Sequence, residues 1–295
     1  SLAREMLPKA LNVDPEKLVI VSIMPCTAKK FEARRPEFSQ SGRRDVDFVI
    51  TTQELSQMIE SSGLQFSELA PESLDLPLGF KTGAGVIFGT TGGVTEAVLR
   101  FAVEKVSGKT LENVDFHCVR GNDSLREAEL EVAGKKLRVA VVHGLKNAGK
   151  IAEQARKGQC RYDIVEVMAC PGGCVGGAGQ PVNFAPETVS RRAKGLYEAD
   201  KMLQLHKSQE NPYIAEAYQS TLGEPGSHKA HELLHTSYQP RKRISDEGIK
   251  LLTGTGENRI QVKVCVGTNC FLKGSQEILK SLTSYVEQHE MAENI

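Results

Sequence analysis

Short apolar runs recur along this chain and are separated by stretches with the spacing of amphipathic helices. Residues 18–24 are almost continuously apolar and rich in β-branched side chains, and residues 46–51 and 137–142 are shorter runs of the same kind. The pattern of residues 18–24 is typical of a strand covered on both faces, as in a parallel sheet. We therefore predict strands at these positions, and three more at residues 85–88, 114–119 and 164–168.

Helical patterns fill the intervals between these runs. Apolar residues three and four positions apart predict helices at residues 1–11, 146–157 and 187–206. Thr51 and Glu54 have the spacing of a capping box, in which each side chain binds the other residue's backbone where a helix begins. Further helices are expected at residues 52–62, from 94, from 212, at 227–235 and at 275–288. Strand, helix and strand joined by short connections predict an α/β fold of parallel sheets flanked by helices.

Composition excludes several classes of protein. The 295 residues include 37 basic and 37 acidic side chains, so no basic surplus favours nucleic acid as a partner. No apolar run approaches the ~18 residues that would span a membrane. Seven cysteines do not form a dense disulfide framework in a chain of this length, and a reducing cytoplasm fits them better. The chain opens inside a predicted helix and without methionine, so we expect its true N-terminus to lie upstream.

A loop rich in cysteine and glycine follows the predicted strand at residues 164–168. Residues 166–181 hold Cys170, Cys174 and five glycines. Glycine has no Cβ, so the main chain can approach a bulky group closely, and thiolates are soft ligands. The combination indicates a soft-metal cofactor pressed against the backbone. The cysteine spacing also leaves a disulfide or a zinc knuckle open.

Two of the cysteines occupy equivalent places at the ends of predicted strands. Cys26 stands just beyond the strand at residues 18–24, and Cys170 stands just beyond the strand at residues 164–168. In parallel α/β sheets, ligands gather beyond the carboxyl ends of strands. We therefore expect folding to bring these two cysteines together, although they are far apart in the sequence.

Two motifs carry a resemblance to a known family. Residues 24–32 read Met-Pro-Cys-Thr-Ala-Lys-Lys-Phe-Glu, and residues 166–181 read Glu-Val-Met-Ala-Cys-Pro-Gly-Gly-Cys with a glycine-rich tail that ends in Gln-Pro. They resemble the second and third signatures of [FeFe] hydrogenases, Met-Pro-Cys-x-x-Lys-x-x-Glu and Glu-x-Met-x-Cys-x-x-x-Cys, in the family's order. The resemblance extends over residues 1–243 and implies the fold of the family's H-cluster domain.

The resemblance implies an active site built on an H-cluster, in which a [4Fe-4S] cubane is joined to a di-iron unit with carbon monoxide, cyanide and dithiolate ligands. Cys26 and Cys170 would bind the cubane, and Cys174 would bind it and bridge to the di-iron unit. Lys29 would donate a charge-assisted hydrogen bond to an iron-bound cyanide. A soft wall around the di-iron unit would come from Met24, Met168 and Phe88. The implied activity is reversible interconversion of dihydrogen with protons and electrons.

One part of the family pattern is missing. The first signature, Thr-Ser-Cys-Cys-Pro, supplies the remaining cubane cysteine and a proton-relaying cysteine, and it is absent from this sequence. Three of the four cubane thiolates are therefore present. We predict that the chain is the C-terminal part of a longer catalytic subunit. We also predict that residues 1–295 alone cannot hold a complete, active H-cluster.

The C-terminal residues carry a second cysteine pair. Cys265 and Cys270 form a C-x4-C segment similar to the start of the thioredoxin-like [2Fe-2S] domains of multisubunit hydrogenases, and two cysteines without a metal are the alternative. We predict an H-cluster domain at residues 1–243, a linker at 244–258 and a truncated [2Fe-2S] domain at 259–295. This domain suggests an NAD(P)-linked or electron-bifurcating enzyme. Its partners would be ferredoxin, NAD(P)-reactive flavoprotein subunits and hydrogenase maturation proteins.

Other interpretations stay open from the sequence. Hydrogenase-like iron–sulfur assembly proteins share the cysteines but carry no di-iron unit, and Lys29 and the two methionines favour the enzyme over them. The glycine turn at residues 89–93 precedes a helix and could cradle phosphate, but no P-loop lysine follows it. Glu166 is expected to hold the cysteine loop. Cys118 and Cys160 have no partner at metal spacing and are interpreted as structural.

Overall fold

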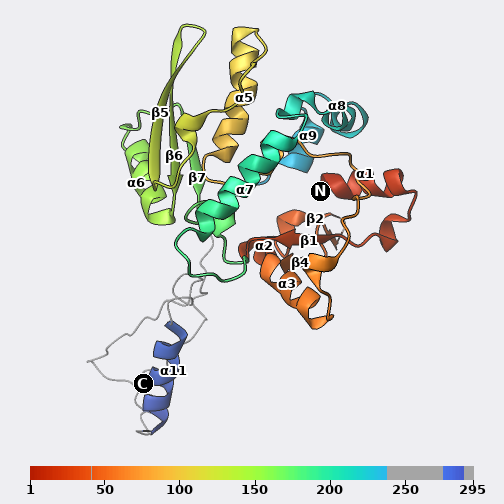
Figure 1. Ribbon diagram of the computed structural model, residues 1–295, viewed down its shortest axis with the longest axis vertical. Helices are drawn as coiled ribbons and strands as arrows, with labels where there is room; N and C mark the ends of the chain where they lie inside the picture. Colours follow the sequence, from red (N-terminus) through yellow and green to blue (C-terminus); the bar gives the residue numbers. More distant parts are fainter. Residues whose placement is uncertain (41, 238–274, 289–295) are drawn as a thin grey trace. The chain divides into compact units, whose positions relative to one another are not determined.

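The computed structural model of the chain describes residues 1–40, 42–237 and 275–288 (Figure 1). The chain divides into two units, Ser1–Thr236 and Ser237–Ile295. In the second unit the described residues form α11 (Ser275–Gln288), which confirms the helix predicted there. The predicted linker at residues 244–258 and the segment with Cys265 and Cys270 lie outside the described residues.

The first sheet consists of two parallel strands near the N-terminus. Strand β1 (Val21–Met24) pairs with β4 (Phe48–Thr51), and α3 (Thr52–Ser61) begins directly after β4. The capping box is confirmed: Glu54 N donates to Thr51 Oγ1 at 3.1 Å, and Thr51 N donates to Glu54 Oε2 at 2.8 Å. The sequence therefore sets the point where strand ends and helix begins.

The prediction that the first strand is covered on both faces is wrong for the described residues. β1 begins at Val21 rather than at residue 18, and the side chains of Val21 and Ile23 are 48% and 53% exposed. A parallel sheet normally has both faces packed. In the described part of the chain this sheet has two strands, so alternate side chains of β1 are left half-exposed.

The second sheet is mixed and supplies the main core. Its order is β5 (Leu125–Val132), β6 (Lys135–His143) and β7 (Ile164–Met168), with β5 antiparallel and β7 parallel to β6. Helix α6 (Leu145–Arg156) connects β6 to β7, which confirms the predicted β-α-β unit. The central strand is the most deeply buried: Val139, Ala140, Val141 and Val142.

Two predicted strands are wrong. Residues 85–88 belong to α4 (Gly83–Ile87) and its C-cap Phe88. The β-branched residues suggested a strand, but small residues let this segment form a helix tightly against α7: a Cβ on Gly83 would lie 1.6 Å from Asp200 Oδ1. Residues 114–119 end in a 3-10 turn, His117–Val119, rather than forming a strand.

A third, short antiparallel sheet pairs β2 (Ser39–Gln40) with β3 (Arg43–Arg44), and further helices accompany the sheets. The bounds of the longer ones are α1 (Leu2–Leu11), α5 (Gly93–Ser107) and α7 (Thr188–Met202). The shorter ones are α2 (Ala28–Glu32), α8 (Pro212–Ala217) and α9 (His228–Leu234). In the view of Figure 1, α7 lies between the three-stranded sheet and the β1–β4 lobe, and Arg100 of α5 binds Asp200 of α7. Among the described residues, no helix combines the length and apolarity that crossing a membrane requires.

A buried network of charges joins α5 to α7. Arg100 is fully buried and donates to both carboxylate oxygens of Asp200, at 3.1 and 2.7 Å, and to Glu96 at 2.9 Å. Glu96 also accepts from Arg120 Nε at 2.8 Å. Burial alone would raise the pKa of Asp200, but the hydrogen bonds from Arg100 and His206 outweigh it and hold this pKa below its usual range.

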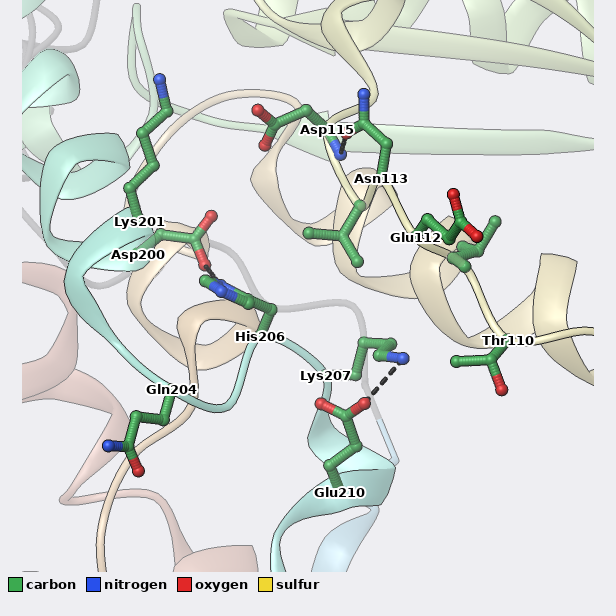
Figure 2. Close-up of a pocket in the computed structure, with 12 residues that line it drawn as sticks. Thr110, Glu112, Asn113, Asp115, Asp200, Lys201, Gln204, His206, Lys207 and Glu210 are labelled. Carbon is green, nitrogen blue, oxygen red and sulfur yellow. Dashed lines mark hydrogen bonds and ion pairs between the residues drawn. The ribbon is translucent and has the colours of Figure 1, made fainter.

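A cavity of about 420 Å³ opens beside this network (Figure 2). Two pairs of charged side chains lie on its walls: His206 Nδ1 lies 3.2 Å from Asp200 Oδ1, and Lys207 Nζ donates to Glu210 at 2.6 Å. Lys207 also pairs with Glu104 at 2.7 Å. These pairs explain how the charges are accommodated, and we assign no ligand to the cavity.

Candidate metal centre

Three cysteines from two distant segments come together in the first unit. Cys26 follows β1, Cys170 follows β7, and Cys174 begins a 3-10 turn within the same loop as Cys170. Burial raises the pKa values of Cys170 and Cys174, and the neighbouring Cys26 thiol raises both further. Cys26 thus lies beside the other two, as the positions beyond the strand ends led us to expect, and backbone contacts between the two segments agree.

The glycines of the loop permit contact with the backbone that carries Cys26. Gly179 N donates to Pro25 O at 3.1 Å, and a Cβ on Gly179 would lie 2.7 Å from Cys26 N. A Cβ on Gly177 would lie 2.0 Å from Pro25 O. From the sequence we expected these glycines to let the main chain approach a cofactor. In the structure they let one cysteine segment lie directly on the other.

The glycine turn before α5 supports the same loop from another direction. Thr91 N donates to Gly172 O at 3.1 Å, and Val175 N donates to Gly89 O at 3.0 Å. These two bonds lie on either side of Cys174 in the sequence. The turn therefore fixes the backbone around Cys174 through main-chain hydrogen bonds alone.

A carboxylate of the chain itself occupies the N-terminus of α5. Glu166, buried on β7, accepts hydrogen bonds from Gly92 N at 2.6 Å, Thr95 N at 2.7 Å and Thr95 Oγ1 at 2.8 Å. A negative group here satisfies free N–H groups and complements the helix dipole. The phosphate interpretation of residues 89–93 is therefore wrong, because Glu166 fills the place where an anion would bind.

Replacing Glu166 with glutamine should lower the free energy of unfolding by about 1.5–3 kcal/mol, the range for hydrogen bonds to a charged group. The amide cannot accept at both oxygen positions, so its NH2 group would face a backbone donor. Urea unfolding of the full chain measures the effect, and Glu131→Gln on the exposed side of β5 is the matched control. Equal stabilities of the two variants would contradict the role given to Glu166.

Of the residues expected to surround a di-iron unit, Met24, Lys29 and Met168 are near a cysteine in the sequence, and Phe88 precedes Gly89, whose carbonyl accepts from Val175 N. Met24 and Met168 end β1 and β7, and Phe88 caps α4 with its side chain about half-exposed. Lys29 Nζ donates to both oxygens of Glu32, at 2.7 and 2.9 Å. Its positive charge also lowers the pKa of Cys174, against the larger effect of burial.

The donor set fits an iron–sulfur cluster better than the alternatives. All five cysteines in the described ranges are free, so the disulfide interpretation of Cys170 and Cys174 is wrong. Within those ranges no three His, Cys, Asp or Glu side chains converge on one metal ion. In a cubane each thiolate binds a separate iron, so its ligands need not converge on a point. Cys26, Cys170 and Cys174 can supply three soft thiolate ligands to such a cluster.

Together, the fold and this thiolate set define the class of α/β proteins that hold an iron–sulfur cluster beyond the ends of strands. Residues 1–178 match the family described as iron only hydrogenase large subunit, C-terminal domain, and residues 186–241 match iron hydrogenase small subunit. The chain belongs to the iron-only hydrogenase family, as its two cysteine motifs indicated.

Individual relatives agree with this assignment. The chain is 46% identical over 245 residues to the NADP-reducing hydrogenase subunit HndD of Solidesulfovibrio fructosivorans, covering 83% of this chain and 42% of that subunit. It is 34% identical to cytosolic iron-sulfur assembly component 3 of Rattus norvegicus, covering 83% of this chain and 52% of that protein. A variant of [FeFe]-hydrogenase HydA1 from Chlamydomonas reinhardtii superposes with a TM-score of 0.68 at 39% identity, over 80% of this chain and 67% of that one. The chain thus spans about half the length of these curated relatives.

Sequence reasoning identified the cysteines but missed residues that hold them. Arg192 on α7 donates to Val175 O at 3.2 Å and to Pro181 O at 2.8 Å. Thr95 was also missed as a partner of Glu166. No local motif marks these residues, because their partners lie on other elements.

Proposed function

We propose that this chain is the H-cluster-binding part of an [FeFe] hydrogenase catalytic subunit, which interconverts dihydrogen with protons and electrons. The observation that carries the proposal is the meeting of Cys26 with the Cys170–Cys174 loop, through contacts that only glycine permits. Membership of the iron-only hydrogenase family supports it.

Three thiolates would hold the cubane: Cys26, Cys170 and Cys174. When bound, the H-cluster would supply the iron at which dihydrogen is split and a store for the electrons. Burial raises the pKa values of Cys170 and Cys174, so these thiols are protonated near neutral pH before iron arrives. Binding of iron therefore has to displace protons from them.

The residues around the thiolates would orient and shield the bound group. We propose that Lys29 exchanges its partner Glu32 for a cyanide ligand, since both side chains are about 40% exposed and their ion pair is weak. Met24, Met168 and Phe88 would exclude water from the carbonyl ligands. The roles of Lys29, Met24 and Met168 follow from the match of these positions to the family motifs, and that of Phe88 from the wider resemblance.

The electron partners are proposed from the relatives and the C-terminal cysteines. HndD is named an NADP-reducing hydrogenase subunit, and an NAD(P)-linked or electron-bifurcating complex would suit this chain. In it, Cys265 and Cys270 would contribute to a [2Fe-2S] cluster that passes electrons to ferredoxin or to flavoprotein subunits. The free thiols of the described cysteines suit a reducing cytoplasm.

A role in iron–sulfur assembly without hydrogen chemistry is the alternative. The assembly component of Rattus norvegicus aligns over the same share of this chain as the hydrogenase subunit. Lys29, Met24 and Met168 favour the enzyme. A cubane alone needs neither a hydrogen-bond donor to cyanide nor apolar side chains around carbon monoxide ligands.

Anaerobic reconstitution of the full chain with ferrous iron and sulfide tests the cubane. We expect cluster absorbance in the wild type, and its loss in Cys26→Ser, Cys170→Ser and Cys174→Ser. Cys118→Ser and Cys160→Ser are matched controls that should retain it. Retention of the cluster in Cys26→Ser would contradict the site.

The hydrogen chemistry is tested in a chain that also carries the Thr-Ser-Cys-Cys-Pro motif, produced with hydrogenase maturation proteins. Infrared bands of iron-bound carbon monoxide and cyanide are expected, together with hydrogen evolution. A cubane without these bands would favour the assembly role.

A further inference from the structure

Arg192 connects the two ends of the glycine segment that follows Cys174. Its two terminal nitrogens donate to Val175 O at 3.2 Å and to Pro181 O at 2.8 Å. Val175 is the residue directly after Cys174, and Pro181 closes the loop. The planar fork of a guanidinium can bind two acceptors at once, whereas a lysine ammonium is a single point charge.

The segment that Arg192 spans is the one in contact with Cys26. Between its ends, Gly177 and Gly179 lie against the backbone of Pro25 and Cys26. Fixing residues 175 and 181 therefore fixes how the Cys174 loop rests on Cys26.

The helix that carries Arg192 packs on the cluster loops along one face. Val189 lies against Gly172, where a Cβ would come within 2.3 Å of Val189 Cγ1. Leu196 lies against Gly89, where a Cβ would come within 2.7 Å of Leu196 Cδ1. Residues 189, 192 and 196 recur at the spacing of one helical face. Helix α7 also lies in the part of the chain that matches the small-subunit family, whereas the cysteines lie in the part that matches the large subunit.

We propose that Arg192 is a positioning residue for the iron–sulfur cluster. This inference rests on the proposed function. In it, α7, which matches the small-subunit family, holds the loop with Cys174, which matches the large-subunit family. Arg192 acts through the carbonyls of Val175 and Pro181 and touches no reacting atom. Its fork keeps Cys174 in register with Cys26, and its positive charge favours the more reduced cluster.

The test compares two adjacent arginines on the same helix. Arg192→Met removes the fork, and Arg191→Met removes an equal charge from an exposed side chain. Each full chain is reconstituted with ferrous iron and sulfide, and iron release to a chelator is followed. We expect release to be about tenfold faster from Arg192→Met, the lower end of the effect of outer-shell substitutions on metal affinity. Arg191→Met should match the wild type.

Two further readouts separate positioning from general stability. The midpoint potential of the cluster should become more negative in Arg192→Met. The electron paramagnetic resonance spectrum of the reduced cluster should also change. Arg192→Lys keeps the positive charge but cannot bind both carbonyls at once. Its midpoint potential should be close to that of the wild type, but its iron release should remain faster than in the wild type. Urea midpoints of the iron-free variants show whether each chain is folded.

The outcomes distinguish this inference from the function on which it rests. If no cubane is taken up even by a chain that also carries the Thr-Ser-Cys-Cys-Pro motif with the fourth cysteine, the proposed function and this inference both fail. If the wild type binds a cubane and Arg192→Met matches Arg191→Met in release, potential and spectrum, this inference alone is overturned.

Discussion

Replacing Arg100 with methionine should lower the free energy of unfolding of this chain by about 3–5 kcal/mol. The guanidinium is fully buried and neutralises two carboxylates, Glu96 and Asp200. Methionine fills similar space but leaves Asp200 without its bidentate partner and Glu96 without one of its two arginines. Breaking a buried ion pair from one side costs this much because the remaining charge stays buried and uncompensated.

The loss of stability in Arg100→Met should depend on pH. In the wild type Arg100 holds the pKa of Asp200 below its usual range, so the pair stabilises the fold above that range and the contribution is lost on acidification. Without Arg100, burial dominates and raises this pKa, so Asp200 binds a proton on folding. The difference in the free energy of unfolding between Arg100→Met and the wild type should therefore become smaller as the pH falls.

Urea unfolding at two pH values measures the effect. Arg156→Met is the matched control, because Arg156 pairs with Glu153 on the exposed surface of α6. Exposed pairs contribute about 0–1 kcal/mol. A loss in Arg100→Met no larger than in Arg156→Met would show that the buried network does not hold α5 to α7.

The sequence predicted those features that depend on residues near one another in the chain. The capping box of Thr51 and Glu54, the β-α-β unit around α6, and the cysteine motifs are all local patterns. The meeting of Cys26 with Cys170 could also be anticipated, because the ends of parallel strands are where ligands gather.

What holds the site could not be predicted in the same way. The cysteine motif marks Glu166, but its carboxylate binds the start of α5 and not the cysteine loop as we expected. Arg192 binds that loop from α7, and nothing in its own segment marks it. Arg100 and Asp200 are far apart in the sequence, and only packing of α5 and α7 reveals them as partners. Tertiary contacts, rather than local patterns, determine these roles.

The errors in secondary structure have related causes. The β-branched residues at 85–88 predict a strand, but these residues form part of α4, which approaches α7 closely at Gly83. β5 was missed because it alternates exposed and half-buried positions at the sheet edge instead of forming an apolar run. An apolar run predicts that its residues are buried, but it does not show whether they form a helix or a strand.

Replacing Gly177 with alanine should abolish stable cluster binding. The φ angle of Gly177 is −68°, which alanine adopts freely, so conformational strain is not the cause. The added Cβ would lie 2.0 Å from Pro25 O and 2.9 Å from Cys174 O, and both neighbours are backbone atoms that cannot turn aside. The loop has to lift from the Cys26 segment, which separates Cys174 from Cys26. We expect iron uptake to fall to the level of Cys26→Ser, and stability to fall by about 1–3 kcal/mol, as for overpacking.

Gly195→Ala on α7 is the control that isolates close approach from glycine loss in general. Among the described residues, no heavy atom other than those of its chain neighbours and its own helix backbone lies within 4 Å of a Cβ at Gly195, and the residue is exposed within α7. Alanine there should stabilise the chain by roughly 0.5–1 kcal/mol and leave iron uptake unchanged. Wild-type iron uptake in Gly177→Ala would mean that the cluster does not need the two cysteine segments in contact, and the site would have to be placed elsewhere. Loss of iron in Gly177→Ala alone would show that contact between the two backbones is what brings the three thiolates to one cluster.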